Sequence, residues 1–443
     1  MTSGVEPLSA DQSKWRWRIL ISTYLAYAGY YFTRKVFGLI KTSLNEQFGW
    51  SIDSIAHIWT AFLVAYMVGQ FLCGFIGRRW GPRVLLLGGL GISIACNIIF
   101  GFTNSYGTFM TFMIVNGLAQ ASGWPGAVGG VARWLRPLER GRVMGVWSTS
   151  YIVGNIAVKM IASTLLGLAG WRWSYFGCTL ISFLIWWVVF LWQRDKPEDI
   201  GLKAIVEPDK EDTRTVRAST DDQVTAGQYL RLAFNPVILA MGISYFSIKF
   251  LRYALDSWLP TILALMGVSK ATAGWYSIFF DVGGVIPAVL SGWALDRLFK
   301  GNWAKLCFFM SIGLIFGYLC ILRFEHNPLG MAICFGLVGF MIYGPDTMLS
   351  GAASVHVAGN KNGVAVAGLV NGIGSLGPVV QEEMIGWILK GKDKVAGIHS
   401  VNLLALAMSV AFSLLMLVVM WYVHGAHKKN RALDDAAAAA GKT

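Results

Sequence analysis

The sequence is poor in charge, cysteine and sequence motifs for catalysis. Only 14% of its 443 residues are charged, with 24 acidic residues against 37 basic ones. The six cysteines form no CxxC pair and have no histidine pair nearby, which argues against a disulfide framework or a metal site. No phosphate loop, Ser/His/Asp arrangement or nucleotide fingerprint is visible. We therefore expect no cofactor, no metal and no enzymatic activity.

Apolar residues take the place of charge. Hydrophobic residues make up 55% of the chain, glycine occurs 51 times and the mean hydropathy is +0.54, more than a soluble core of this length needs. The sequence predicts an all-α membrane protein with twelve transmembrane helices in a lipid bilayer, each long enough to cross about 30 Å of hydrocarbon. The expected spans cover residues 18–40, 55–77, 83–103, 107–131, 141–167, 171–193, 235–261, 270–295, 303–323, 328–354, 362–389 and 400–424.

The basic residues lie near the chain ends and in alternate loops rather than in one patch, so nucleic acid is not the expected partner. With an even number of spans, the positive-inside rule places both termini in the cytoplasm. We expect a multi-pass protein of the plasma (inner) membrane. The basic clusters that set this orientation are Lys14, Arg16, Arg18, Arg78, Arg79, Arg83, Arg133, Arg136, Arg140, Arg142, Lys428, Lys429 and Arg431.

One sequence offset relates the two halves of the chain. It separates Arg34 from Arg252, and it also separates the loop string that begins at Gly74 from the one that begins at Gly292. Such a repeat predicts two pseudo-symmetric six-helix bundles. The expected domains are a cytoplasmic N-terminal segment (1–17), a first bundle (18–193), a cytoplasmic linker (194–234), a second bundle (235–424) and a cytoplasmic tail (425–443).

Four short strings stand out along the chain. They are Tyr30-Tyr-Phe-Thr-Arg34-Lys35, Asn116-Gly-Leu-Ala-Gln-Ala-Ser-Gly-Trp-Pro125, Lys196-Pro-Glu-Asp-Ile-Gly-Leu202 and Tyr343-Gly-Pro345. These strings resemble the organophosphate:phosphate antiporter family of the major facilitator superfamily. The resemblance extends over about residues 15 to 425 and implies the major facilitator fold. It also implies a secondary transporter that exchanges a phosphorylated sugar or polyol, of the hexose phosphate or glycerol 3-phosphate type, for inorganic phosphate by alternating access.

Two arginines within predicted spans carry the expected chemistry. A charge at membrane depth costs about 3 kcal/mol on insertion scales, so such residues usually face a cavity or a partner. Guanidinium is always charged and can bind two phosphate oxygens at once. The resemblance implies that Arg34 and Arg252 bind the phosphate. The alternative is that each arginine only pairs with a nearby acid such as Asp256 or Asp281.

Further residues are expected near the substrate. Lys35 lies about 100° around the helix from Arg34, so it either adds positive potential or extends toward the membrane surface. Gln120 and Trp124 either shape the site or pack the fourth span, whose glycines and Pro125 are expected to allow close helix approach and a bend. Tyr151 stands where bacterial members of the family carry histidine. The complete set of expected substrate-binding residues is Arg34, Arg252, Lys35, Tyr31, Gln120, Trp124, Tyr151, Lys249 and Asp281.

Four other charged residues in predicted spans form a separate set of candidates for charge pairing or proton coupling. The acids either pair with Lys159, Lys249 or Lys35, or they titrate and couple transport to protons. A third interpretation is that the eleventh span is drawn too deep, which leaves its two glutamates near the outer end. The set is Lys159, Asp346, Glu382 and Glu383.

The repeated loop predicts a gate, for which Asp296, Arg297 and Arg79 are the expected residues. In the first half Arg78 stands where the second half has an acid, so that half of the gate should be weaker or rebuilt. Two other functions stay open, a sugar-phosphate sensor of the same fold and a proton-coupled organic-anion symporter. A monomer is expected by analogy with the superfamily.

Overall fold

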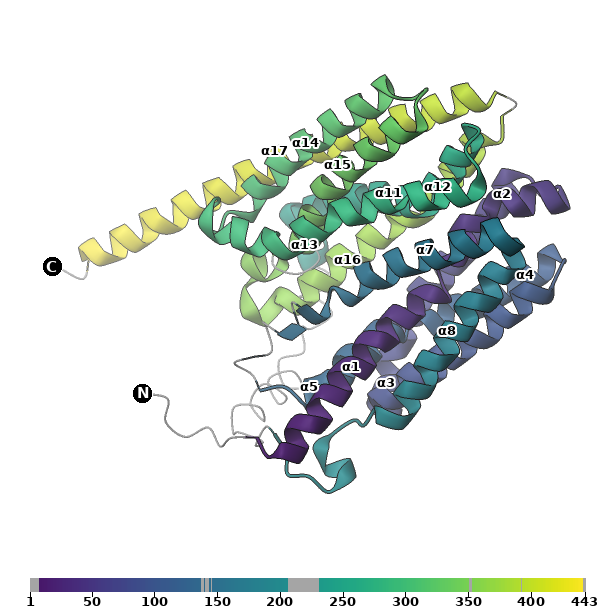
Figure 1. Ribbon diagram of the computed structural model, residues 1–443. Helices are drawn as coiled ribbons and strands as arrows, with labels where there is room; N and C mark the ends of the chain where they lie inside the picture. The colour runs from purple at the N-terminus through teal and green to yellow at the C-terminus, as the bar shows by residue number, and fades with distance from the viewer. Residues whose placement is uncertain are drawn as a thin grey trace. The chain divides into compact units, whose positions relative to one another are not determined.

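The computed structural model describes the backbone of residues 8–136, 139, 143–144, 146–205, 231–349, 353–391 and 393–440. Within these ranges the side chains at 71, 74–79, 132, 288–289, 296, 354–365, 367 and 423–440 are not described. Two of the expected gating residues, Arg79 and Asp296, therefore lie outside the described side chains. All regular secondary structure in the described ranges is helical (Figure 1).

The helices follow the predicted spans closely, although several spans are divided. The first half of the chain forms α1 (Ala10–Phe32), α2 (Val36–Phe48), α3 (Ile52–Phe102), α4 (Tyr106–Gln120), α5 (Gly123–Ala132), α7 (Ser150–Ala169), α8 (Trp171–Trp192) and the 3-10 helix η1 (Pro197–Ile200). The second half forms α11 (Pro236–Leu265), α12 (Lys270–Tyr276), α13 (Ile278–Arg297), α14 (Trp303–Arg323), α15 (Pro328–Thr347), α16 (Ala353–Leu389) and α17 (Lys394–Ala440).

Eight helical stretches among the described residues are long and apolar enough to cross a membrane. The predicted first, fourth and eighth spans are each divided between two helices, namely α1 and α2, α4 and α5, and α12 and α13. The chain is an integral, multi-pass, all-helical membrane protein.

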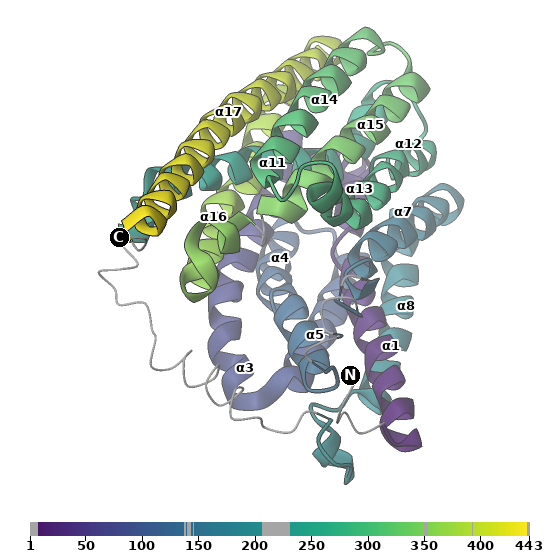
Figure 2. The same ribbon diagram turned by 90° about the vertical axis from the view of Figure 1, so that its left-hand side faces the viewer.

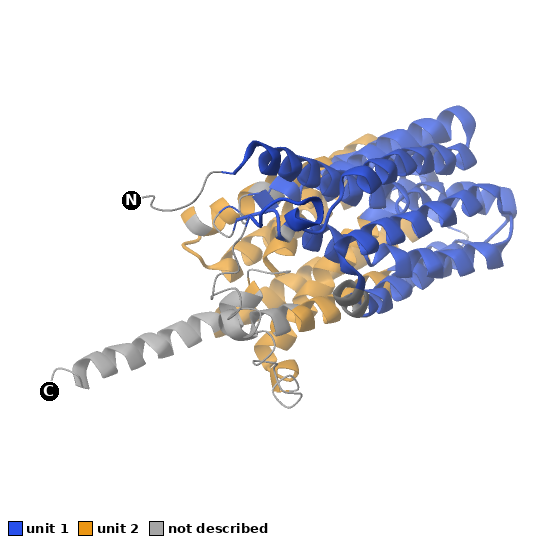
Figure 3. Cartoon of the chain, turned by 90° about the horizontal axis from the view of Figure 1, so that it is seen from below, with its two compact units in different colours: residues 1–221, 256–281, 382–394 blue, residues 222–255, 282–381, 395–443 orange. Residues whose placement is uncertain are grey.

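The chain groups into two compact units (Figure 3). Unit 1 comprises Met1–Asp221, Asp256–Asp281 and Glu382–Lys394, and unit 2 comprises Asp222–Leu255, Val282–Gln381 and Val395–Thr443. Unit 1 thus adds the last part of α11, α12, the first residues of α13 and the end of α16 to the helices of the first half. The predicted division into two sequential six-helix bundles is not tested by this grouping and stays a prediction.

Close helix packing in unit 1 depends on glycine. Helices α1, α7 and α8 lie side by side, and α3 packs along α4 (Figure 2). A Cβ atom on Gly117 of α4 would lie 2.5 Å from the carbonyl oxygen of Phe62 in α3, and one on Gly69 would lie 2.9 Å from the carbonyl oxygen of Leu118. Only glycine allows the two backbones to approach this closely. The expected close approach of the glycine-rich fourth span is confirmed.

The second and third predicted spans meet at a sharp kink inside α3. Gly81 has φ 81°, in the left-handed region that favours glycine, and Pro82 follows it. The Arg83 backbone N–H donates to Asp195 Oδ1 at 2.7 Å, and burial raises the pKa of the Asp195 carboxyl above its usual range. The segment after α8 therefore supplies a carboxylate at the kink of α3. In the repeated loop string of this half, Arg78 stands where the second half has an acid.

Unit 2 shows the same use of glycine. Helices α14 and α15 pack together, and a Cβ atom on Gly283 of α13 would lie 2.0 Å from the carbonyl oxygen of Gly336 in α15. A Cβ atom on Gly377 of α16 would lie 2.5 Å from the carbonyl oxygen of Phe246 in α11. These approaches bring α11, which carries Lys249 and Arg252, into backbone contact with α16.

Candidate functional site

The first span is broken at the residue expected to bind phosphate. Helix α1 ends at Phe32 and α2 begins at Val36, so Arg34 lies in the turn between them. Backbone groups freed by a break inside a membrane need hydrogen-bond partners. The Thr33 carbonyl accepts from Asn97 Nδ2 at 2.8 Å and from Asn116 Nδ2 at 3.2 Å. Amide side chains from α3 and α4 thus support the break.

Gln120 supports the same turn. Its side-chain nitrogen lies 3.2 Å from the Tyr30 carbonyl oxygen, 2.8 Å from Thr33 Oγ1 and 3.2 Å from Ser93 Oγ, and the residue is 3% exposed. The amide N–H groups therefore point at α1 and α3. The contacts in the structure favour the packing role that the sequence analysis considered for Gln120.

Arg34 is buried among aromatic rings of unit 1. Its guanidinium carbon lies 4.7 Å from the ring centre of Tyr66, 5.6 Å from that of Phe62 and 5.9 Å from that of Tyr31. Aromatic faces attract guanidinium and restrict its orientation. Arg34 is therefore held in place by its surroundings while it keeps its full positive charge.

An aromatic cluster continues from Tyr31. The ring of Tyr27 lies 5.8 Å from Tyr31, 5.2 Å from Trp124 and 5.9 Å from Trp147. Trp124 is 41% exposed, whereas Trp147 is buried. Tyr151, the third aromatic residue expected near the substrate, is half-buried on α7. Tyr27 was not among the expected site residues, although its position one helical turn before Tyr31 places it on the same face of α1.

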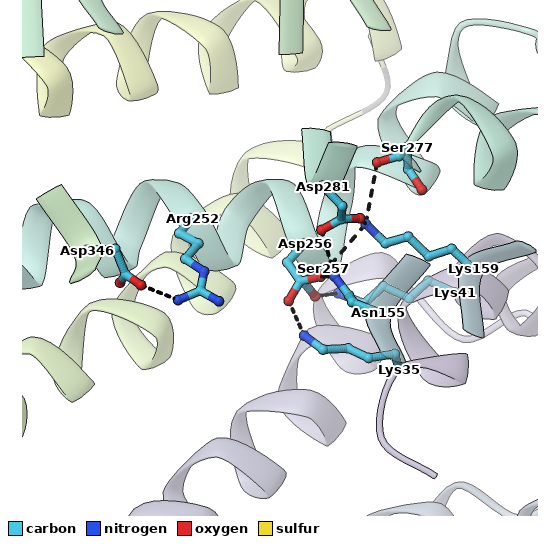
Figure 4. A network of polar contacts seen from close by, with 10 residues as sticks. All are labelled: Lys35, Lys41, Asn155, Lys159, Arg252, Asp256, Ser257, Ser277, Asp281 and Asp346. Carbon is cyan, nitrogen blue, oxygen red and sulfur yellow. Dashed lines mark hydrogen bonds and ion pairs between the residues drawn. The ribbon is translucent and has the colours of Figure 1, made fainter. Parts of the chain in front are cut away.

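Lys35 and Lys159 belong to a network of buried ion pairs in unit 1 (Figure 4). Lys35 pairs with Asp256, and Lys159 Nζ lies 2.6 Å from Asp281 Oδ2. Asn155 Nδ2 donates to both acids, at 3.1 Å to Asp256 Oδ1 and 2.7 Å to Asp281 Oδ1. The network joins α7 and the turn between α1 and α2 to the last part of α11 and the start of α13. Asp281 is thus the partner of a lysine and not of an arginine.

The eleventh-span acids also have basic partners in unit 1. Glu382 pairs with Lys41 of α2, and His57 Nδ1 lies 2.8 Å from Glu383 Oε2. Lys41 was not among the expected residues because the predicted first span ends at residue 40. Its distance of seven residues from Arg34, about two helical turns, was the available signal.

In unit 2, Arg252 pairs with an acid that neither arginine was expected to contact. Its Nη1 lies 2.5 Å from Asp346 Oδ2, and its guanidinium carbon lies 4.7 Å from the ring centre of Tyr343. Lys249, one helical turn earlier on α11, donates to Asn371 Oδ1 at 2.6 Å and to Ser375 Oγ at 3.1 Å. The third gating residue, Arg297 at the end of α13, is exposed.

Buried cations fixed on broken or glycine-packed membrane helices are typical of membrane transport proteins. Among the described residues no group of side chains is suited to hold a metal ion. The sequence matches the Major Facilitator Superfamily over residues 23–381, and the chain belongs to this superfamily. Membership places it among transport proteins and not among enzymes.

Within this superfamily, the chain is similar in sequence to proteins named for sugar phosphates and glycerol 3-phosphate and to a membrane sensor protein. The chain is 29% identical to sugar phosphate exchanger 3 of Mus musculus, covering 84% of this chain and 86% of that protein. It is 28% identical to the glycerol-3-phosphate transporter of Bacillus subtilis, with coverage of 84% and 85%. It is also 28% identical to the membrane sensor protein UhpC of Escherichia coli, with coverage of 86% and 87%. The resemblance to the organophosphate:phosphate antiporter family is confirmed.

Solved structures support the fold. A bacterial homologue of the human lysosomal transporter Spinster, in an inward-facing and unoccupied conformation, aligns with a TM-score of 0.72 at 13% identity, covering 92% of this chain and 97% of that chain. A D-xylose-proton symporter aligns with a TM-score of 0.67 at 16% identity, covering 90% and 97%. The major facilitator fold expected from the sequence is confirmed.

Proposed function

We propose that this protein exchanges a phosphorylated sugar or polyol for inorganic phosphate by alternating access. The observation that carries the proposal is the placement of Arg34 in a supported helix break among aromatic rings. The sugar-phosphate and glycerol-3-phosphate names of the relatives supply the chemical class of the substrate.

The surroundings of the two arginines suit a phosphate monoester. The ester carries roughly −1.5 to −2 charges near neutral pH, and a guanidinium can bind two of its oxygens. Arg34 is oriented by ring faces, whereas Arg252 is held by Asp346. An arriving phosphate can replace the Asp346 carboxylate at Arg252, so substrate binding exchanges one anion for another instead of neutralising an exposed cation.

The aromatic cluster suits the organic part of the substrate. Sugar rings present C–H groups on one face, and aromatic rings bind such faces well. Tyr31 contacts both Arg34 and Tyr27, so the cluster starts next to the proposed phosphate-binding cation. Trp124, which is partly exposed, offers a face to a ligand.

The setting in the cell follows from charge distribution and the superfamily. From the basic clusters we infer that both termini lie in the cytoplasm, and we propose that the protein lies in the plasma (inner) membrane. The apolar outer faces of the helices contact the lipid bilayer. The protein is proposed to act as a monomer, in which one chain contains both halves of the site.

The function is tested by counterflow in proteoliposomes loaded with inorganic phosphate. External labelled phosphate, glycerol 3-phosphate, triose phosphate and hexose phosphate should each be offered in turn. We expect uptake of at least one organophosphate that depends on internal phosphate. Uptake that instead follows a proton gradient without internal phosphate would favour the organic-anion symporter.

A sensor of the same fold is the second candidate function. The match to a membrane sensor protein over most of both chains favours it. A sensor should bind a sugar phosphate tightly and exchange it slowly or not at all. Calorimetric binding measured beside counterflow on the same preparation separates the two functions.

A further inference from the structure

A second buried lysine–glutamate pair lies in unit 1, separate from the network of Lys35 and Lys159. Lys41 of α2 pairs with Glu382 of α16. The Lys41 Nζ also lies 2.7 Å from Ser257 Oγ, and Figure 4 draws these two side chains. The same Nζ lies 3.6 Å from the ring centre of Trp258, whose Nε1 donates to Glu382 Oε2 at 2.9 Å. Lys41 is 2% exposed and Glu382 is fully buried. Each oxygen of the carboxylate therefore has a donor.

The pair lies where α16 passes from one unit to the other. Glu382 is the first residue of the segment Glu382–Lys394, which belongs to unit 1, whereas the preceding part of α16 belongs to unit 2. Asp256 and Asp281 occupy the equivalent places, as the first and last residues of Asp256–Asp281. All three acids pair with lysines from the first half of the chain. These pairs fasten the two segments to the helices of the first half.

Lys41 lies inside α2, seven residues after Arg34, which is in the turn before this helix. Beside Lys41 lies a cavity of about 20 Å³, with room for one water molecule, lined also by Asn45, Trp258 and Thr261. A water molecule in this cavity would be in contact with the pair.

We propose that Lys41 and Glu382 are positioning residues for transport. The pair holds together the helix end at which α2, α11 and α16 finish, and it separates each time that end opens. In the closed state each charge neutralises the other, and water from the adjacent cavity hydrates both when they part. The proposal rests on the alternating access of the proposed function. In the predicted topology this end faces outward.

Thiol labelling tests the pair directly. Thr261 lines the cavity and is 3% exposed, so Thr261→Cys should react slowly with a membrane-impermeant maleimide applied from the outward side. Lys41→Met or Glu382→Gln, added singly, should raise the labelling rate about 10-fold, because each leaves one buried charge without its partner. The double variant should return to within about 3-fold of the starting rate, because no uncompensated charge remains.

Three controls accompany the labelling. Protein with native Thr261 measures labelling of the six native cysteines. Lys41→Arg keeps the positive charge, so Thr261→Cys should react at the starting rate in this variant. Lys270→Met removes an exposed ion pair with Glu46 in the same unit and should change labelling less than about 2-fold. Unchanged labelling in both single pair variants would overturn the proposal.

Counterflow provides an independent readout. The single variants should lower the maximal exchange rate about 10-fold and leave the KM for phosphate within about 2-fold, because the pair acts on opening and not on binding. The double variant should recover most of the rate. A raised KM at an unchanged maximal rate would place Lys41 in the substrate site and contradict the proposal. If the native protein shows no exchange, the proposed function fails while the labelling still reports on the pair.

Discussion

At the scale of single residues, the buried charges are the most informative feature, and the sequence predicts them unevenly. Arg34 and Arg252 stand out because a charge inside an apolar span is costly. The residues that pair with them do not stand out in the sequence. The partner of Arg252, for example, is Asp346, which lies 94 residues away in the chain. Lys41 escaped notice because it lies just past the apolar segment. Sequence spacing alone cannot identify an ion-pair partner that becomes a neighbour only in the folded protein.

Removal of the Asp346 carboxylate should strengthen phosphate binding. Asp346→Asn keeps the shape of the side chain but removes this carboxylate from Arg252. We expect the KM for phosphate in counterflow to fall about 5-fold, which corresponds to about 1 kcal/mol, the typical net contribution of one hydrogen bond. Ser291→Ala, which removes a hydroxyl contact to Thr347 in the same unit, serves as the control. An unchanged KM in Asp346→Asn would show that the carboxylate does not compete.

Loss of the Gln120 amide should destabilise the fold. Gln120→Leu leaves the Tyr30 carbonyl and the Thr33 hydroxyl without this donor. The expected cost is about 1 to 3 kcal/mol, because buried polar groups lose a partner. Thermal unfolding in detergent measures the change. A stable variant that has lost substrate affinity would instead show that the Gln120 side chain contacts the ligand.

At the scale of helices, the sequence predicts where spans lie better than where they break. The fourth span was expected to bend because of its glycines and proline, and α4 and α5 meet there. The break at residues 33–35 has no glycine or proline to mark it. Asn97, Asn116 and Gln120 decide it from other helices. Tertiary hydrogen bonds therefore determine a break that local propensity does not predict.

The kink in α3 gives a prediction at this scale. Gly81→Ala places a Cβ at positive φ and 2.5 Å from Asp195 Oδ2. We expect a loss of stability of about 1 to 3 kcal/mol, seen as a lower Tm. Gly88→Ala on the same helix meets nothing within 4 Å and should be neutral or slightly stabilising. Equal effects of the two substitutions would mean that the kink does not require glycine.

At the scale of the whole molecule, composition and the repeated offset were sufficient to predict a membrane protein of two repeated halves, and the resemblance of four short strings implied the superfamily fold. They were not sufficient to predict which segments associate. Unit 1 includes Asp256–Asp281 and Glu382–Lys394, which the sequence assigns to the second half. Lysine–acid pairs attach both segments, and such long-range pairs leave no periodic signal in the chain. That Arg34 and Arg252 bind the same substrate molecule stays a prediction.

The central claim is that both guanidinium groups bind the transported phosphate, and phosphate counterflow with Arg34→Lys and Arg252→Lys tests it most directly. Lysine keeps the charge but lacks the two-pronged geometry, so each variant should lose about 10-fold to 100-fold in exchange. Arg16→Lys, in an ion pair with Glu139 that is only partly buried, should exchange as well as the native protein. Full exchange by either Arg34→Lys or Arg252→Lys would contradict the account.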